Sequence, residues 1–319
     1  MTKQISDVRV VATSLTVSVS DVLLNLLIAM FTGSTVMLSQ ALQGLSDLVT
    51  GGILYLGVKR SDRKADLKYQ FGYGREIFFW VLMAGMFMFI GTGAFSLYLG
   101  YQQFTNPHPI EYAWAAFAML VWGFMTNLYA FSLSLKRMHR SSLTKGWWHQ
   151  LLHSSIVETK ATFLIDFLGT VAALLGFVAL LAYALTGKAQ FDGIGSMVIG
   201  ISMMLVSILL IRDVRDLIVG KAIDPEVSDR IIGATQTVEG ILSVLDLRTM
   251  YLGSAKMLVI IEVHVQDGLD TDQIEAIIDN IKIVVQQNVP EVHHIQVEVE
   301  TPDGDQEMPI DKKDTKKRT

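Results

Sequence analysis

The chain of 319 residues contains no cysteine, which excludes disulfide scaffolds, zinc fingers, thiol catalysis and iron–sulfur clusters. Charged residues are also scarce. They make up 18% of the sequence, against about 25% in a soluble globular domain. Apolar residues account for 51%, and the mean hydropathy is +0.41. So few charges cannot cover the water-exposed surface of a soluble protein of this size, and the composition therefore indicates an integral membrane protein.

The chain has no excess of basic residues either. Lys and Arg number 26 and Asp and Glu number 31, which gives a formal net charge of −5. Binding to nucleic acid relies on a basic patch, so we expect no nucleic-acid partner. The sequence also has no phosphate-binding loop, no aspartyl-phosphate motif and no nucleophile–base pair at a recognisable spacing. We therefore expect neither an enzyme nor a bound cofactor.

Six apolar segments are each long enough to cross a bilayer, whose hydrocarbon core of ~30 Å takes roughly 20 residues of helix. They cover residues 9–31, 36–58, 77–101, 112–135, 163–186 and 191–212. The first half of the first segment is polar and includes Asp21 and Asn25, so we expect one face of it to point into the helix bundle. Its polar residues interrupt the apolar run and no small-residue cleavage site follows, which argues against a signal peptide.

The basic residues of the loops orient the bundle. The loops between spans two and three and between spans four and five are rich in Lys and Arg, whereas the loops on the opposite side contain only Lys188. Basic loops stay in the cytoplasm. We therefore expect both termini to be cytoplasmic and the protein to lie in the plasma (inner) membrane.

From about residue 220 the pattern becomes that of a small soluble domain. It predicts, in order, a helix at 225–238, strands at 244–252 and 256–266, a helix at 271–287 and a strand at 293–300. Asp224 and Asp270 or Thr271 are the expected helix caps. This order predicts an α+β layer with both helices on one side of the sheet. We divide the chain into a transmembrane domain at 1–219, a cytoplasmic domain at 220–301 and a charged, disordered tail at 302–319.

Among the carboxylates inside the predicted spans, the informative ones are Asp47 in the second and Asp166 near the start of the fifth. A carboxylate at membrane depth is costly unless it is paired, hydrated or bound to a cation, so it marks a functional site. Four residues before each, on the same helical face, stands an oxygen-bearing side chain, Gln43 or Thr162. If the two faces meet, they form an oxygen-rich cage suited to a divalent cation. The alternative is that each aspartate only hydrogen-bonds a neighbouring helix.

Four motifs follow one another along the chain: Gly33-Ser34, Ser39–Asp47, Phe71–Glu76 and Phe191–Ser196. Their order resembles that of the cation diffusion facilitator family of proton-coupled divalent metal exporters. The Phe-Gly-Tyr-Gly-Arg stretch is similar to the zinc-transporter-9-like branch. The resemblance covers about residues 10–300. It implies six transmembrane helices, a ferredoxin-like cytoplasmic domain and a homodimer in the lipid bilayer.

In that family the transport site lies on spans two and five, at positions that correspond here to Gln43, Asp47, Thr162 and Asp166. The two aspartates match the family pattern. Neither Gln43 nor Thr162 is the usual His or Asp, and an all-oxygen site with two charges favours hard ions such as Mn²⁺, Fe²⁺ or Mg²⁺ over zinc. Asn25 and Asn127 are expected to bond helix to helix, with a ligand role as the alternative.

The resemblance also implies regulatory metal between two copies of the cytoplasmic domain, for which His264 and His294 are the candidate ligands. An ordinary solvated sheet face is the alternative. The loop at 69–74 has no histidine, so we expect no metal there. We interpret His149 and His153 as part of a juxtamembrane helix, with cation delivery as the alternative.

Four charges end the sixth span: Arg212, Asp213, Arg215 and Asp216. We expect them either to reach the cytoplasmic surface or to pair with Lys59, Arg60 or their neighbours near the pivot of the dimer.

Two functions fit these observations. The first is a secondary transporter that exports a divalent cation of the zinc, manganese or iron class in exchange for protons, with alternating access to a site between helices two and five. Asp47 and Asp166 would bind the cation when deprotonated and release it when protonated. The second is a non-transporting membrane metal sensor or scaffold with a depleted site. The retained pair of aspartates favours the first.

Overall fold

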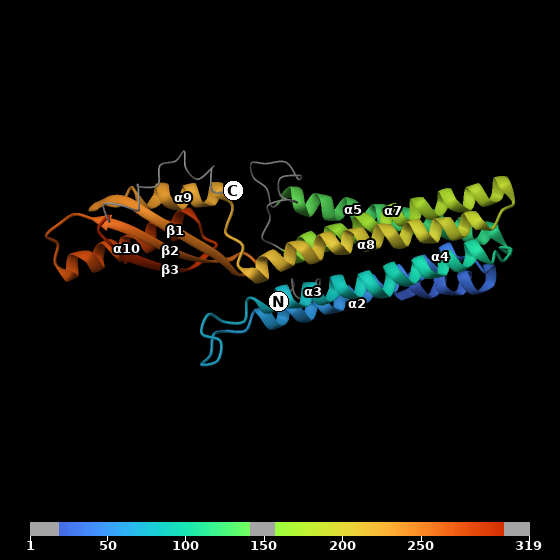
Figure 1. Ribbon diagram of the computed structural model, residues 1–319, viewed down its shortest axis with the longest axis horizontal. Coiled ribbons are helices and arrows are strands. Elements are labelled where there is room, and N and C mark those ends of the chain that lie inside the picture. Colours follow the sequence, from blue (N-terminus) through green and yellow to red (C-terminus); the bar gives the residue numbers. More distant parts are fainter. Residues whose placement is uncertain (1–18, 141–156, 303–319) are drawn as a thin grey trace, which may run out of the picture. The chain divides into compact units, whose positions relative to one another are not determined.

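The computed structural model describes residues 19–140 and 157–302 (Figure 1). The predicted helix around His149 and His153, the first ten residues of the first span and the predicted tail from residue 303 lie outside this described part. The chain forms two compact units. Residues 1–59 and 77–215 belong to the first, and residues 60–76 and 216–319 to the second.

The first unit is a bundle of apolar helices. Its elements are the helix Val19–Thr32, α2 (Thr35–Ser61), α3 (Glu76–Phe87), the π-helix η1 (Met88–Ala94), α4 (Phe95–Thr105), α5 (Ala113–Arg140), α7 (Val157–Thr186) and α8 (Gln190–Val219). Within residues 19–140 and 157–302, five helical stretches are long and apolar enough to cross a membrane, and Val19–Thr32 is a sixth, shorter apolar helix. The expected helical membrane domain is confirmed. The described helix Val19–Thr32 covers only part of the first predicted span.

The π-helix η1 and the helix α4 that continues it pack closely against α8, because glycines face each other along this contact. A Cβ atom added at Gly100 would lie 2.5 Å from the carbonyl oxygen of Gly193, and one added at Gly200 would lie 2.7 Å from that of Gly93. Gly93 and Gly100 are seven residues apart, and so are Gly193 and Gly200, so the same two helix faces meet twice. Small residues that let backbones approach in this way are a main source of helix association in membranes.

The buried carboxylate of Asp192 joins α8 to the beginning of α2. It accepts hydrogen bonds from the backbone N–H of Thr35 at 2.6 Å and from its hydroxyl at 2.7 Å, and from the hydroxyl of Ser34 and the N–H of Val36. A negative charge is favourable at a helix N-terminus, where backbone N–H groups lack partners. Gly33 makes the preceding turn with φ +68°. Two of the motifs that carried the family resemblance therefore meet in one structural contact.

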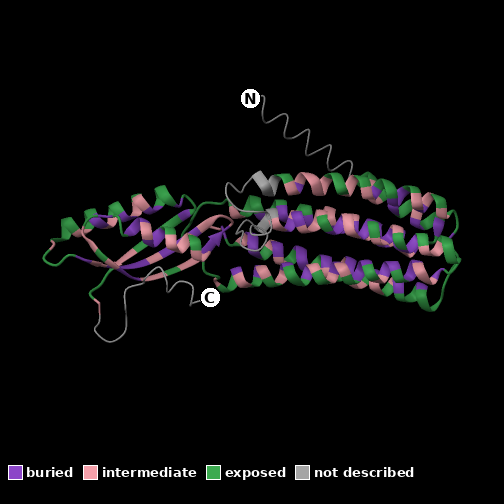
Figure 2. Cartoon of the chain, turned by 90° about the horizontal axis from the view of Figure 1, so that it is seen from above, coloured by how far each residue is buried: buried purple, intermediate pink, exposed green. Residues whose placement is uncertain are grey.

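The second unit is an α+β domain, as the sequence predicts. It contains α9 (Pro225–Thr235), β1 (Ile241–Gly253), β2 (Lys256–Val265), α10 (Thr271–Asn288) and β3 (Val292–Val299). The sheet order is β1-β2-β3, with β1 antiparallel and β3 parallel to β2. Helices α9 and α10 contact each other and the sheet, so they cover the same face. Figure 2 shows how buried and exposed residues alternate along these elements.

Local signals place the ends of these two helices. Asp224 caps α9 by accepting a hydrogen bond from the N–H of Glu226 at 3.0 Å. Asp270 caps α10 and forms a capping box with Gln273, whose side chain accepts from the Asp270 N–H. The first helix ends three residues earlier than predicted, because turns lead from residue 236 to Gly240, whose φ is +90°.

The loop that precedes α3 packs against the α+β domain, which the sequence pattern does not predict. The ring of Phe71 contacts that of His294 edge-on, with centroids 5.5 Å apart. Gly74 lies against the backbone of Leu252 so closely that a side chain would not fit. The guanidinium of Arg75 donates to the carbonyl of Ile218 at 2.5 Å. The loop at 60–76 therefore belongs structurally to the second unit.

Candidate transport site

One face of α2 carries buried oxygen atoms that have no partner. Gln43, Ser46 and Thr50 are 3%, 1% and 2% exposed. The side-chain oxygen of each has no hydrogen-bond partner among the described residues. Such groups are rare in folded proteins because desolvation is then uncompensated, and each calls for an explanation such as a water or an ion. Asp47, four residues after Gln43, extends the same helical face.

The second carboxylate, Asp166, lies on α7 and accepts a hydrogen bond from the hydroxyl of Ser134 on α5. Asp47 and Asp166 are close enough for their charges to interact. A neighbouring contact shows how the helices meet, because a Cβ at Gly169 would lie 3.1 Å from the Nε2 of Gln43. Helices α2 and α7 run in opposite directions, so Asp47 and Asp166 then lie at a similar depth.

The structure thus gathers three of the four predicted ligand positions: Gln43, Asp47 and Asp166. Thr162 lies one turn before Asp166 on α7 and is partly buried. Within residues 19–140 and 157–302, no three His, Asp or Glu side chains are close enough together to hold a metal ion. The arrangement is therefore a carboxylate pair beside the neutral oxygen donors of α2.

In the described part of the chain, the side-chain amides of the two asparagines bond within their own helices and do not link helix to helix as expected. The Nδ2 of Asn25 donates to Asp21, and that of Asn127 donates to the carbonyl of Gly123 at 2.8 Å. The Oδ1 of Asn127 faces Gly169 beside the site. Sequence reasoning missed Asp21 and Ser134 as neighbours of the aspartate pair. An aspartate within the polar half of the first span was the available signal for Asp21.

An ion pair links α7 to α8 near the site. The ammonium of Lys160 pairs with Asp213 and is largely buried, with 13% of its side chain exposed. The sequence suggested that Asp213 would pair with Lys59 or Arg60, or reach the surface. Asp213 pairs with Lys160 instead of Lys59 or Arg60, so that partner assignment is wrong. The other alternative, that Asp213 reaches the surface, agrees with the 42% exposure of its side chain.

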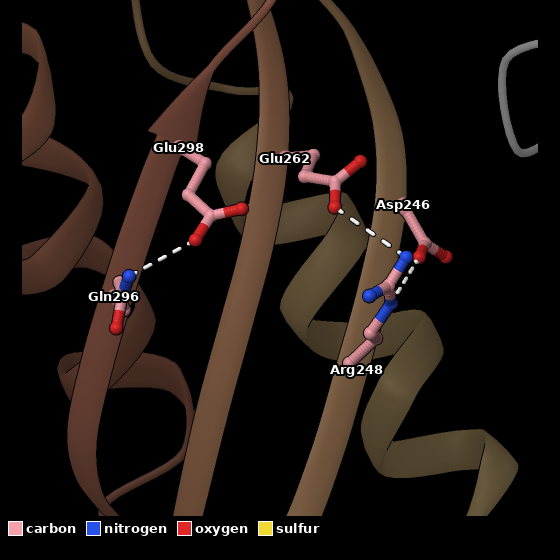
Figure 3. A network of polar contacts seen from close by, with 5 residues as sticks. All are labelled: Asp246, Arg248, Glu262, Gln296 and Glu298. Carbon is pink, nitrogen blue, oxygen red and sulfur yellow. Dashed lines mark hydrogen bonds and ion pairs between the residues drawn. The ribbon is translucent and has the colours of Figure 1, made fainter.

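On the second unit, a row of carboxylates crosses the three strands (Figure 3). Asp246, Glu262 and Glu298 are direct neighbours in the strand register. The guanidinium of Arg248 lies 2.8 Å from Asp246 and 3.7 Å from Glu262. Its pKa is raised, first by the hydrogen bond with Asp246 and then by the nearby negative charges. Gln296 donates to Glu298 at 2.9 Å. Arg248 of the protein itself therefore supplies the positive charge beside these carboxylates.

The two candidate histidine ligands of the same sheet lie far apart in one chain. His264 stands opposite Ser243, whereas His294 pairs with Leu258, six positions earlier on β2. At about 3.3 Å per residue, this separation is roughly 20 Å along the strand. His294 is also engaged by the ring of Phe71. One copy of the domain does not bring His264 and His294 into a single site.

Ionisable residues inside an apolar helical bundle are typical of membrane proteins with an ion or substrate pathway. The match to family sequences agrees with this class. A cation efflux transmembrane domain matches residues 11–219, and a cation efflux protein cytoplasmic domain matches residues 223–302. The chain belongs to the cation efflux, or cation diffusion facilitator, family. The resemblance seen in its motifs is confirmed, and the relatives support the zinc-transporter-9-like branch.

Several curated relatives match more than half of this chain. The mitochondrial proton-coupled zinc antiporter SLC30A9 of Homo sapiens is 25% identical over 198 residues, which is 61% of this chain and 35% of the relative. Metal tolerance protein C4 of Arabidopsis thaliana is 24% identical over 60% of this chain and 43% of its own length. This chain thus spans less than half of these relatives. A solved zinc form of a MamM CTD variant matches 27% of this chain and 94% of that chain, at 21% identity and a TM-score of 0.25.

Proposed function

We propose that this protein is a secondary transporter that exports a divalent metal cation in exchange for protons. The observation that carries the proposal is the pair of Asp47 and Asp166 on facing helices, beside buried oxygens of α2 that lack partners. Carboxylates inside a membrane bundle mark ion pathways and proton relays. The family to which the chain belongs is one of metal cation efflux.

The chemistry of exchange follows from the charges of the pair. Two neighbouring carboxylates repel each other, and either a divalent cation or protons relieve the repulsion. Cation and protons therefore compete for the same oxygens. If the bundle alternates between inward-open and outward-open forms around α2 and α7, an excess of protons on the outer side displaces the cation there. The proton gradient then drives export.

The donor set bears on which cation is carried. Gln43 and Thr162 offer neutral oxygens in place of imidazole, and such a set suits Mn²⁺, Fe²⁺ or Mg²⁺ better than zinc. The names of the relatives include zinc antiporters. We therefore propose a substrate of the zinc, manganese or iron class and treat the choice among them as the first question for experiment.

We also propose the oligomeric state and the membrane location of the protein, from its family and from the charges of its loops. The protein would act as a homodimer, which the match to the cytoplasmic domain supports. It is a multi-pass integral membrane protein, and the distribution of basic residues favours a plasma (inner) membrane with both termini in the cytoplasm. Metal at His264 or His294 would then need ligands from a second copy.

The test is ion flux in proteoliposomes that contain the purified full chain. Zn²⁺, Mn²⁺, Fe²⁺, Co²⁺ and Mg²⁺ are offered one at a time, with and without a pH gradient. We expect flux of at least one ion, accelerated by the gradient. Flux of none of them, with binding retained, would favour a non-transporting metal sensor.

Two variants assign the flux to the site. We expect Asp47→Ala and Asp166→Ala each to abolish transport while the protein stays folded and inserted, because each removes one buried charge without adding volume. Ser132→Ala is a suitable control, since among the described residues that hydroxyl bonds only to the carbonyl of Tyr129 on its own helix. Normal transport by either aspartate variant would show that the residue is not part of the site.

A further inference from the structure

A third aspartate, Asp21, lies on the helix Val19–Thr32 at the depth of the proposed cation site. The turn at Gly33 makes this helix antiparallel to α2. Val22 and Gly44 fix the register between the two helices, because a Cβ atom at Gly44 would lie 2.8 Å from the Cγ2 atom of Val22. Asp21 precedes Val22 by one residue, and Asp47 follows Gly44 by three. In an antiparallel pair these offsets run in the same direction, toward the cytoplasmic ends of both helices.

The carboxylate of Asp21 is only partly used by its own helix. One oxygen, Oδ2, accepts a hydrogen bond from Asn25 at 3.1 Å. The other oxygen, Oδ1, is buried and has no partner in the described part of the chain. The charge of Asp21 interacts with that of Asp47. Asn25 thus holds the Asp21 side chain through Oδ2, while Oδ1 has no partner among the described residues. The negative charge of Asp47 nearby makes this position of Asp21 unfavourable by itself.

An independent observation points to a ligand at the site between α2 and α7. Gln43 is 3% exposed, and its Oε1 has no partner among the described residues. The sequence had already shown that the partner positions, Gln43 and Thr162, are neutral where the family carries His or Asp. The site on α2 and α7 therefore has unused oxygen donors but only two charges of its own.

We propose, building on the transport function above, that Asp21 supplies a third negative charge to the cation site and so raises its affinity for divalent cations. It acts through the electric field around Asp47 and Asp166, as a positioning residue, and not as a resident ligand. The described residues hold no cluster of three carboxylates close enough to ligate one ion, which is consistent with this role. Because Coulomb energy scales with the charge of the ion, one added negative charge stabilises a divalent cation twice as much as a monovalent one.

The test compares Asp21→Asn with Asp21→Glu in the full chain. Asparagine keeps an oxygen that accepts from Asn25 and removes only the charge, whereas glutamate keeps the charge. We measure the Kd of Mn²⁺ and of Zn²⁺ in detergent and the KM and maximal rate of flux in proteoliposomes. For Asp21→Asn we expect Kd and KM to rise about tenfold, which is about 1.4 kcal/mol. We expect the maximal rate and the thermal unfolding midpoint to change little, and Asp21→Glu to retain most of the affinity.

The outcomes separate this inference from the function on which it rests. Wild-type protein that binds no divalent cation, or an Asp47→Ala variant that binds normally, would overturn the transport site itself. A wild type that binds and an Asp47→Ala variant that does not, together with an unchanged Kd for Asp21→Asn, would overturn only the role of Asp21. A loss of affinity in both Asp21→Asn and Asp21→Glu with a lowered unfolding midpoint would also contradict it, because the residue would then be structural.

Discussion

The close contact of α4 with α8 makes a stability prediction whose size can be worked out from the structure. A Cβ atom at Gly100 would lie 2.5 Å from the carbonyl oxygen of Gly193 and 2.6 Å from the backbone N of Met197. Ordinary contacts of this kind begin near 3.4 Å. Both obstacles are backbone atoms, so no change of rotamer can relieve the overlap. In Gly100→Ala the two helices must therefore separate locally by about 0.9 Å, the difference between these distances.

That displacement has an estimable cost. A radial gap of 0.5–1 Å already forfeits about a quarter to a half of the dispersion energy of each contact it opens. Overpacking by a single methyl group typically costs about 1–3 kcal/mol. For a domain of 150–250 residues, each kcal/mol lowers the unfolding midpoint by about 2–4 °C. We expect Gly100→Ala to lower it by several degrees.

Thermal unfolding of the purified protein in detergent, followed by intrinsic fluorescence, measures this shift. Gly123→Ala on α5 is the matched control, because an added Cβ there would meet nothing within 4 Å. It should be neutral or slightly stabilising, since alanine favours helix more than glycine does. If Gly100→Ala were as stable as wild type, α4 and α8 would not meet at these glycines and the described packing would be wrong.

Two further predictions concern the ligands and the loop. Replacing Gln43 and Thr162 together by His should raise the affinity for Zn²⁺ relative to Mn²⁺ by about tenfold or more, because the site gains imidazole nitrogen. Competition binding measures this ratio of affinities. An unchanged ratio would mean that these two positions do not face the cation. In the loop at 60–76, the hydroxyl of Tyr73 donates to Asp66 at 2.6 Å, and this bond is the main cause of the lowered pKa of Asp66. The contribution of Asp66 to loop stability should therefore be complete above its unfolded pKa of about 3.8 and be lost as the pH falls through the lower folded value. Tyr73→Phe should move the pKa measured by NMR back toward its ordinary value, and an unaltered titration would refute the role of this bond.

Much of the architecture was predictable because it depends on residues that are close in the chain. The caps at Asp224 and Asp270 and the strand of alternating residues ending at Val265 are local signals. The α+β order of the second unit and the apolar helices of the first followed from them. Strand ends were less accurate: β1 begins at Ile241, three residues before the prediction, because pairing with β2 extends it.

The candidate site was predictable only in part. Asp47 and Asp166 stand out because a charge inside an apolar run is conspicuous in any sequence. The neighbours that surround them do not stand out. Ser134 is one hydroxyl among many, and Asp21 sits in a segment whose polarity masks it. Their roles depend on which faces of which helices meet.

The sequence by itself determined which segments enter the membrane and that Asp47 and Asp166 lie inside them. Hydropathy and helical periodicity are properties of short stretches of sequence. Tertiary structure decided the partners. It paired Lys160 with Asp213 and brought Phe71 of the loop at 60–76 into contact with His294 of the α+β domain. It also separated His264 from His294 along the sheet. Such choices depend on helix rotation and strand register. A shift of one residue changes them while leaving hydropathy and periodicity almost the same.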